Sequence, residues 1–390
     1  MHKVIISIIL SLLCIEATGS SKLDTLKHPA QKATYQLVKT DSIIVNKLSI
    51  IQITDYNPKT KRYLAYDQVS KACMELDQNG KILKEVDLTG EGPGHFGRGM
   101  SAMGYIGDTK VIEGGASYIF YDEDWNYLNK YTPGSGYLPS GPLPNDILGI
   151  AMDSENFIVK PIDQNYFGSK KLENHHFLTA SMIEVFNGTS IKPNPFLAYP
   201  DNSVYQQKKV YYDFHRPHLS VNKTNQLLYL ALPLEQKLYV YDLKKGLKLQ
   251  EITTLKLEGF NSPEGISFND QHKNPRKGFG PSNTRNTILN VTNSAIMDIS
   301  SEGSTTILVH KTGTKRSDFT DVNKAYEAAK RQNKYFTSFM KNGEVVLSLE
   351  QRFKQMVRLD ENRFITPYLS SEDEELDYNK FYIYELQKIN

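Results

Sequence analysis

The chain has 390 residues, 39% of them apolar, and its 46 basic and 44 acidic residues leave a formal net charge of +2. So small a charge argues against a nucleic-acid partner, because phosphate binding requires a concentrated basic surface. This length and apolar content suffice for one large domain or two modest ones.

The N-terminus is typical of a secretory signal. A basic "MHK" precedes an apolar run at residues 4–13, and the small residues Ala17 and Gly19 follow. This pattern predicts a signal peptide over residues 1–19 and export to the periplasm, the outer membrane or the cell surface. A competing interpretation makes Cys14 the lipidated first residue of a lipoprotein, although Leu13 is bulkier than the processing enzyme usually accepts. Such a lipid would be the only membrane attachment.

Residues 72–99 contain a hairpin followed by a glycine-rich segment. "ACMELD" reads as a strand, "QNG" as a tight turn and "KILKEVDL" as a returning outer strand with alternating polarity. Cys73 lies inside the first strand, so we expect it to fill the core rather than to act as a nucleophile. "TGEGPGHFGRG" supplies residues that tolerate positive φ where the chain crosses to the next strand. Its G-x-G-x-G spacing, with no helix after it, does not fit a phosphate-binding loop.

The same pattern of strand, turn and strand recurs along the chain. We mark its turns at residues 77, 122, 187, 242, 301 and 360. The mean spacing of about 57 residues leaves room for two more strands in each interval, as in a four-stranded propeller blade. Six turns predict six blades. The C-terminal "KFYIYEL" is either a closing strand or the remnant of a seventh blade.

The fold class predicted is therefore all-β: a single β-propeller of residues 47–390 behind an N-terminal segment, residues 20–46. A strand within residues 34–45 is expected to close the ring by pairing with the last blade. One short helix is predicted within residues 317–332, where Val322, Ala325, Tyr326 and Ala329 follow helical spacing after capping residues.

The stretch "LDQNGKILKEVDLTGEGPGHF" (76–96) resembles the strand, turn, strand and G-x-G-P-G-x-F segment of exported six-bladed β-propeller lipoproteins of Bacteroidetes. The chain is most similar to a subgroup described as a domain of unknown function. The resemblance is strongest over residues 48–131 and 226–254, and members often carry Glu where this chain has His95. It implies a propeller, export and outer-membrane anchoring, and it carries no catalytic residues.

Two polar segments are candidate ligand contacts. The first, within "YYDFHRPHLS" (211–220), comprises Tyr212, Asp213, His215, Arg216 and His218. Pro217 argues against a helix that would direct His215 and His218 to one metal, so no metal site is assigned. The second lies within residues 269–286 and is locally cationic, which suits a carboxylate or an acidic sugar; it comprises His272, Lys273, Arg276, Lys277 and Arg285. For both segments, ordinary packing or a solvated loop is the alternative.

No catalytic motif is present: the sequence has no G-x-S-x-G elbow and no H-E-x-x-H. We therefore expect a non-enzymatic, extracytoplasmic binding or scaffold protein without a cofactor, whose loop face contacts a glycan, a peptide or an envelope protein. The alternative is a propeller hydrolase or lyase acting on a carbohydrate or lactone-like substrate, with a divalent metal in the channel. A role as a subunit of an envelope complex would predict an exposed apolar patch on one rim.

Overall fold

The structure is a computed structural model. It describes residues 34–115, 117–132, 147–152, 155–161, 181–187, 194–207, 209–211, 216–261, 263–267, 288–314, 319–369 and 376–389. The chain divides into two units, residues 1–32 and 33–390. All described residues lie in the second unit, so the predicted signal peptide and Cys14 lie outside them.

Six four-stranded antiparallel sheets follow one another along the described chain. Sheet 1 contains β2 (Ile51–Asn57), β3 (Arg62–Asp67), β4 (Cys73–Leu76) and β5 (Ile82–Val86). Sheet 2 contains β6 (Met100–Ile106), β7 (Thr109–Gly114), β8 (Ser117–Tyr121) and β9 (Tyr127–Tyr131). Sheet 3 contains β10 (Gly149–Met152), β11 (Glu155–Pro161), β12 (Ser181–Asn187) and β13 (Asn194–Ala198).

The C-terminal half repeats this arrangement. Sheet 4 contains β15 (His218–Asn222), β16 (Leu227–Ala231), β17 (Lys237–Asp242) and β18 (Lys248–Thr254). Sheet 5 contains β20 (Ala295–Glu302), β21 (Thr305–Lys311), β22 (Tyr335–Lys341) and β23 (Glu344–Leu349). Sheet 6 contains β24 (Val357–Arg358), β25 (Arg363–Pro367), β26 (Asn379–Lys388) and the N-terminal β1 (Tyr35–Val45).

Short elements lie between the sheets. β14 (Lys209–Val210) pairs with β19 (Ile266–Ser267), a 3-10 turn covers Val204–Gln206, and residues 288–292 are helical. The helix α3 (Val322–Gln332) confirms the helix expected within residues 317–332. Its N-cap, Asp321, accepts hydrogen bonds from the backbone N–H groups of Asn323 and Lys324, which the first helical turn leaves unpaired.

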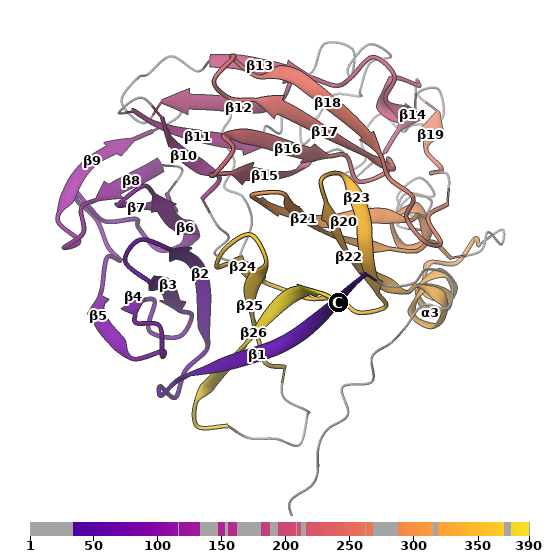
Figure 1. Ribbon diagram of the computed structural model, residues 1–390. Helices are drawn as coiled ribbons and strands as arrows, with labels where there is room; N and C mark the ends of the chain where they lie inside the picture. Colours follow the sequence, from indigo (N-terminus) through magenta and orange to yellow (C-terminus); the bar gives the residue numbers. More distant parts are fainter. Residues whose placement is uncertain are drawn as a thin grey trace, which may run out of the picture. The chain divides into compact units, whose positions relative to one another are not determined.

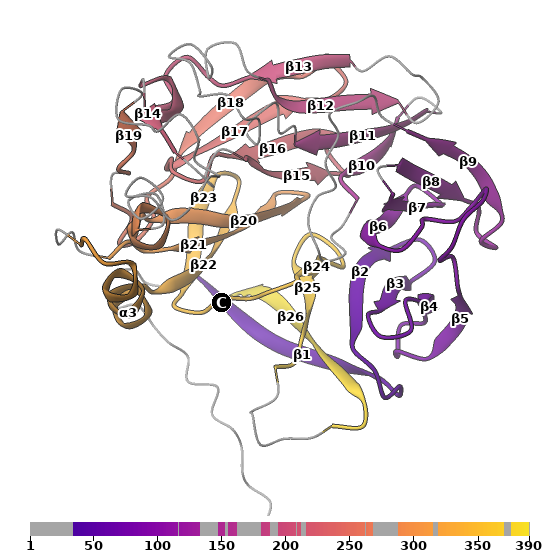
Figure 2. The ribbon, with the colours of Figure 1, turned by 180° about the vertical axis from the view of Figure 1, so that it is seen from behind.

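The first strand of each sheet lies nearest a common axis, as Figures 1 and 2 show for β2, β6, β15 and β24. Within the ring, β2 contacts both β6 and β24, β6 contacts β10, and β15 contacts β20. Each sheet therefore packs face to face against the next one. This arrangement is an all-β propeller, as the sequence predicts.

Six separate hydrophobic clusters fill the seams between the sheets. Ile53 and Ile365 belong to the cluster between sheets 6 and 1, and Phe339 and Phe364 to the one between sheets 5 and 6. The other four clusters join sheets 1 and 2, 2 and 3, 3 and 4, and 4 and 5. The core therefore forms a closed cycle, and each sheet is buried on both faces.

Two of these seams also hold buried ion pairs. Lys110 of β7 lies 3.4 Å from Glu75 of β4, and Lys160 of β11 lies 3.1 Å from Glu113 of β7. Burial lowers the pKa of Lys110, while Glu75 raises it. Because a buried charge that loses its partner is costly, these pairs restrict which sheets can pack side by side.

The two ends of the chain meet in sheet 6. β1 pairs with β26 from Tyr35↔Lys388 to Val45↔Asn379, with one register shift near Thr40. The side chain of Asn379 joins this sheet to sheet 1: it accepts from the Ile51 N–H at 3.1 Å and donates to the carbonyls of Lys47 and Ser49 at 3.0 Å. Residues 34–45 therefore supply the fourth strand of the last sheet.

The predicted turns do not all occupy the same place in a sheet. The turns near 77, 122, 187 and 242 join the third and fourth strands of sheets 1 to 4, as expected. Those near 301 and 360 instead join the first and second strands of sheets 5 and 6, so treating them as outer hairpins was wrong. An inner and an outer hairpin carry the same local signal. The outer turn of sheet 5 is Asn342-Gly343, with φ of 49° and 82°.

The glycine-rich segment behaves as expected. "KILKEVDL" contains β5, the outermost strand of sheet 1, and β6 follows as the innermost strand of sheet 2. Between them Gly90, Gly92, Gly94 and Gly97 all have positive φ, and Gly90 and Gly97 form an isolated bridge. A Cβ on Gly94 would lie 3.1 Å from the Tyr127 side chain, so this position requires glycine on both counts.

If ring closure supports the whole molecule, truncating a buried side chain of β1 will destabilise it globally. We predict that Ile43→Ala, at a site only 3% exposed, lowers the free energy of unfolding by about 2–5 kcal/mol. Its neighbour Ile44 is 40% exposed, so Ile44→Ala is the matched control and is expected to change it by no more than about 0.5 kcal/mol. Equal, small effects in chemical denaturation would show that β1 is peripheral.

Candidate functional site

The two faces of the propeller differ in the length of their loops. Because neighbouring strands are antiparallel, loops that join the first to the second strand and the third to the fourth lie on one face, which we name the turn face. These loops have only two to six residues. The opposite face, the connection face, holds the sheet-to-sheet crossings and the loops between second and third strands. Its segments include residues 199–217, 255–294 and 312–334.

On the turn face, a lysine crosses the axis. Lys223 follows β15 in sheet 4, and its Nζ lies 3.2 Å from Asp55 Oδ2 of β2 and 3.3 Å from the Tyr105 carbonyl of β6. Sheet 4 is the third sheet from sheet 1 in either direction around the ring, so this contact joins opposite sides. The side chain of Lys223 therefore obstructs the axis at the turn face.

Asparagines join neighbouring inner strands at the same face. Asn57 ends β2 and donates to the Gly107 carbonyl of sheet 2 at 3.4 Å. Asn222 ends β15 and donates to the Gly303 carbonyl of sheet 5 at 2.8 Å. Both glycines have positive φ, near 60°. This repeated contact ties the turn of sheet 1 to that of sheet 2, and the turn of sheet 4 to that of sheet 5.

On the connection face, the structure brings the stems of the two predicted ligand-contacting segments together. β14 precedes the first segment and β19 precedes the second, and these two strands pair with Val210 opposite Ile266. A Cβ on Gly265 would lie 2.6 Å from the Tyr211 ring, so only glycine permits this contact. Most predicted contact residues lie outside the described residues: Tyr212, Asp213, His215, His272, Lys273, Arg276, Lys277 and Arg285.

A buried carboxylate fixes the first of these stems. Glu235, in the loop after β16, accepts hydrogen bonds from the Val204 N–H at 2.8 Å, the Tyr239 hydroxyl at 2.6 Å and the Ser203 hydroxyl. The Tyr205 ring stacks on the Tyr199 ring and meets the Tyr211 ring edge to face, with a centroid separation of 5.3 Å in both pairs. Burial, with Glu235 adding to it, raises the pKa of Tyr211 to about 12. The stem is therefore rigidly supported.

Of the predicted contacts that are described, His218 lies at the axis and Arg216 is half-buried just before it. His218 is the first residue of β15, the innermost strand of sheet 4, and it is half-buried. It therefore belongs to a strand and not to a loop. Burial lowers its pKa to about 4, although a hydrogen bond with the Ile296 backbone opposes this shift. The imidazole is thus neutral at physiological pH, and it faces sheet 5.

Asp298 lies on β20, the inner strand that contacts β15, and the sequence analysis did not identify it as a candidate. Its side chain is exposed although β20 is the innermost strand of sheet 5. Because both faces of that sheet pack against neighbours, the solvent reaching Asp298 lies on the side of the axis. The surrounding protein raises its pKa to about 6. The hydrogen bond from the Ile299 N–H and the positive charge of the nearby Arg352 act in the opposite direction and lower it. Arg352, on the β23–β24 crossing, stacks its guanidinium 5.1 Å from the Tyr335 ring.

A second feature of the connection face is an aliphatic patch beside the ring closure. We define the rim patch as four side chains that are 58–81% exposed: Leu48, Ile50, Val69 and Leu369. The Gln68 N–H donates to the Ile50 carbonyl at 2.9 Å, which holds the β1–β2 crossing against the β3–β4 loop. Asn379 and the pairing of Tyr368 with Lys380 bring the β25–β26 loop to the same place.

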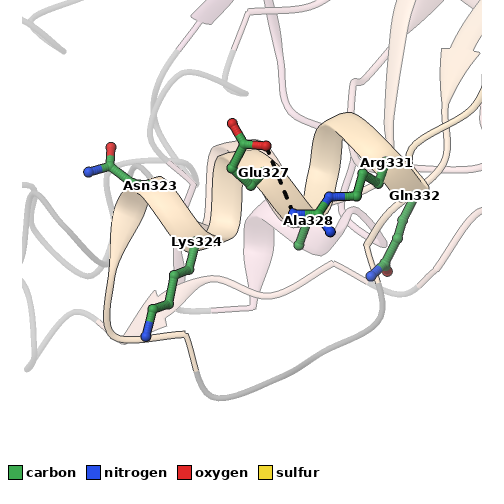
Figure 3. A pocket seen from close by; sticks show the side chains of 6 residues that line it. All are labelled: Asn323, Lys324, Glu327, Ala328, Arg331 and Gln332. Carbon is green, nitrogen blue, oxygen red and sulfur yellow. Dashed lines mark ion pairs between the residues drawn. The ribbon is translucent and has the colours of Figure 1, made fainter.

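The inserted helix presents a shallow depression. Figure 3 shows that its described lining residues all belong to α3, namely Asn323, Lys324, Glu327, Ala328, Arg331 and Gln332. Glu327 and Arg331 form an ion pair at 4.0 Å, and both side chains are mostly exposed. A single helix surface with a solvated pair gives no convergence of groups from different elements.

Within the described residues, no group of three or more His, Cys, Asp or Glu side chains is placed to hold a metal ion. In the same part of the chain, no helix is both long and apolar enough to cross a membrane. Cys73 is fully buried in β4 and unpaired, which confirms its place in the core, and burial raises the pKa of its thiol.

Comparison with known proteins supports the fold. No protein-family model matches the chain, and no curated protein matches it. Among solved structures, a member of the DUF4221 family from Bacteroides vulgatus superposes with a TM-score of 0.62 at 12% identity, covering 92% of this chain and all of that one. A protein from Bacteroides fragilis, named as exported, gives a TM-score of 0.53 at 9% identity, covering 93% of this chain and 98% of that one. At these identities the likeness shows a shared propeller fold.

The two titratable groups at the axis predict opposite pH dependences of stability. The pKa of His218 is lowered on folding, so the stability it provides is lost as the pH falls from about 6.5 towards 4. The pKa of Asp298 is raised on folding, so the stability it provides is present at low pH and lost as the pH rises through about 6.

We therefore expect His218→Gln to lose less stability than the wild type between pH 7 and pH 5. Asp298→Asn should be more stable than the wild type at pH 8, and this advantage should shrink towards pH 4. Urea titrations of the three proteins across this pH range measure both effects. Parallel pH profiles for all three would contradict the two pKa shifts.

Proposed function

We propose that this protein is a non-enzymatic binding or scaffold module whose connection face contacts a peptide, a glycan or an envelope protein. The asymmetry between the faces supports this proposal most strongly. The turn face is built from short hairpins, is tied together by Asn57 and Asn222, and is obstructed at the axis by Lys223. The connection face has the long segments, the groups at the axis and the rim patch. Binding residues concentrate on loops held by a rigid scaffold.

The rim patch favours a macromolecular partner among these candidates. Exposed aliphatic side chains that occur singly need no explanation, but a contiguous patch on a soluble protein marks an interaction site. The rim patch combines four such side chains from three separate loops beside the ring closure. This feature agrees with the expectation that an envelope-complex subunit carries an apolar patch on one rim.

We further propose that each four-stranded sheet is one blade, so that the propeller has six blades and belongs with the exported propellers of Bacteroidetes. Six sheets and six intervening hydrophobic clusters support the count. The similarity to the DUF4221 protein and to the protein named as exported supports the grouping and an extracytoplasmic location. Lipid attachment at Cys14 remains part of this proposal.

One observation favours the enzymatic alternative: His218, with a lowered pKa, and Asp298, with a raised pKa, lie on adjacent inner strands. Perturbed pKa values of this kind are common at catalytic sites, but buried structural groups share them. A hydrolase or lyase would need this pair to act on a bound substrate, and its activity would depend on a divalent metal if one occupied the channel.

A thermal melt of the protein against short peptides, glycans, divalent metals and chelator tests the proposal. We expect a peptide or glycan to raise the melting temperature whether or not chelator is present. A ligand at one hundred times its dissociation constant stabilises the folded state by about 2.7 kcal/mol, which is readily measured. A shift that requires Ca²⁺ or Zn²⁺ and disappears with chelator would favour the enzyme instead.

Two exposed basic residues on opposite faces provide matched controls. Arg352 lies on the connection face over the Tyr335 ring, whereas Lys59 lies on the turn face and pairs with Asp108 at 2.5 Å. Arg352→Ala should weaken the ligand-induced shift, and Lys59→Ala should leave it unchanged. The reverse result would assign binding to the turn face and overturn the proposed site.

A further inference from the structure

A small aspartate motif recurs on the innermost strands. In β2 the register shifts between Ile53 and Asp55, and in β20 it shifts between Ile296 and Asp298. At both bulges the Asp Oδ1 accepts a hydrogen bond from the N–H of the following residue at 2.8 Å. The motif Ile-x-Asp is therefore one structural device used twice, and bulges of this kind redirect a side chain away from the regular pleat.

The two copies differ in what the second carboxylate oxygen contacts. Asp55 Oδ2 accepts from the Tyr105 N–H at 2.7 Å and lies 3.2 Å from the Lys223 ammonium group. Asp298 Oδ2 has no hydrogen-bond or ion-pair partner among the residues that the structure describes. The Oδ2 atom of Asp55 thus has its hydrogen-bond donors within the protein, whereas the Oδ2 atom of Asp298 faces solvent on the axis.

The two aspartates also lie at different distances from the turn face. Asp55 lies two residues before the end of β2, and Asp298 lies four residues before the end of β20. At ~3.3 Å per residue, Asp298 is roughly 7 Å farther from the turn face. Lys223 obstructs the axis on the turn-face side, so a molecule that reaches Asp298 comes from the connection face.

We propose that Asp298 receives an ammonium group, either a lysine side chain or a chain terminus, from a peptide or protein segment that enters along the axis from the connection face. The proposed interaction follows the one at Asp55, where a lysine ammonium group and a backbone N–H both donate to Oδ2. A peptide offers the same two donors together. This inference rests on the proposed binding function and names the ligand group for that face.

Binding of a defined probe tests this assignment. The probe is acetyl-Gly-Lys-Gly-amide, and the comparison peptide carries acetyl-lysine in place of lysine; both are titrated into the protein and followed by NMR. We expect the lysine peptide to bind and the acetylated peptide to bind at least about tenfold more weakly, because a charge-assisted hydrogen bond is lost.

Two isosteric variants give the decisive comparison. Asp298→Asn should weaken the lysine peptide about tenfold or more. The matched control is Asp41→Asn in β1, where the same bulge places Asp41 Oδ1 2.7 Å from the Ser42 N–H on an exposed outer strand. Asp41→Asn should bind like the wild type, and Asp298→Glu should retain part of the affinity.

Equal affinity of the wild type and Asp298→Asn would overturn the inference, as would equal affinity for the two peptides or no binding of either. None of these results decides whether the protein is a binding module, which the thermal melt tests separately. If peptides or glycans still raise the melting temperature in a way that depends on Arg352, the connection face binds a ligand by other contacts. If no such shift occurs either, both proposals fail together.

Discussion

Pairing between the two ends of the chain is the contact on which the rest of this structure depends. Thr40 and Ile383, 343 residues apart, meet in the β1–β26 ladder. Without β1, sheet 6 would lose its outer strand and the cluster between sheets 6 and 1 would lose Ile43 and Val45. Closing so long a loop costs conformational entropy that grows only slowly with length, so the burial of one complete seam can offset it. Once the ring is closed, every sheet has a neighbour on both faces.

That closure also determines what the two ends of the axis can do. The inner strands run side by side, so their ends collect short turns at one face and long crossings at the other. Lys223 can span from sheet 4 to Asp55 only because the ring holds opposite sheets at a fixed separation. The same rigidity keeps Asp298 surrounded by protein yet reachable by solvent. An unpaired carboxylate in such a place is stable only at a cost, which is why it suggests a ligand rather than a structural role.

Local signals in the sequence were sufficient to predict the hairpins. They were insufficient to predict whether a hairpin joins the inner or the outer strands of a sheet. Asn-Gly turns and alternating strands identified the all-β class, the outer strand at residues 82–86 and the helix capped by Asp321. The turns near 301 and 360 were misplaced because nothing local distinguishes an inner hairpin from an outer one. Asp298 was overlooked for the same reason: its role depends on β20 being innermost. The repeated Ile-x-Asp at 53–55 and 296–298 is the one signal that could have revealed it.

The pKa of Asp298, measured by NMR titration of its side-chain carboxyl group, tests the account most directly. The carboxyl resonance can be assigned by its disappearance in Asp298→Asn. We predict a pKa near 6 in the free protein, because the surrounding protein disfavours the charged form, and a fall in that pKa when the lysine peptide saturates the site. A pKa close to 3.9, the ordinary value for aspartate, that does not change with the peptide would contradict an enclosed, unpaired carboxylate at the axis.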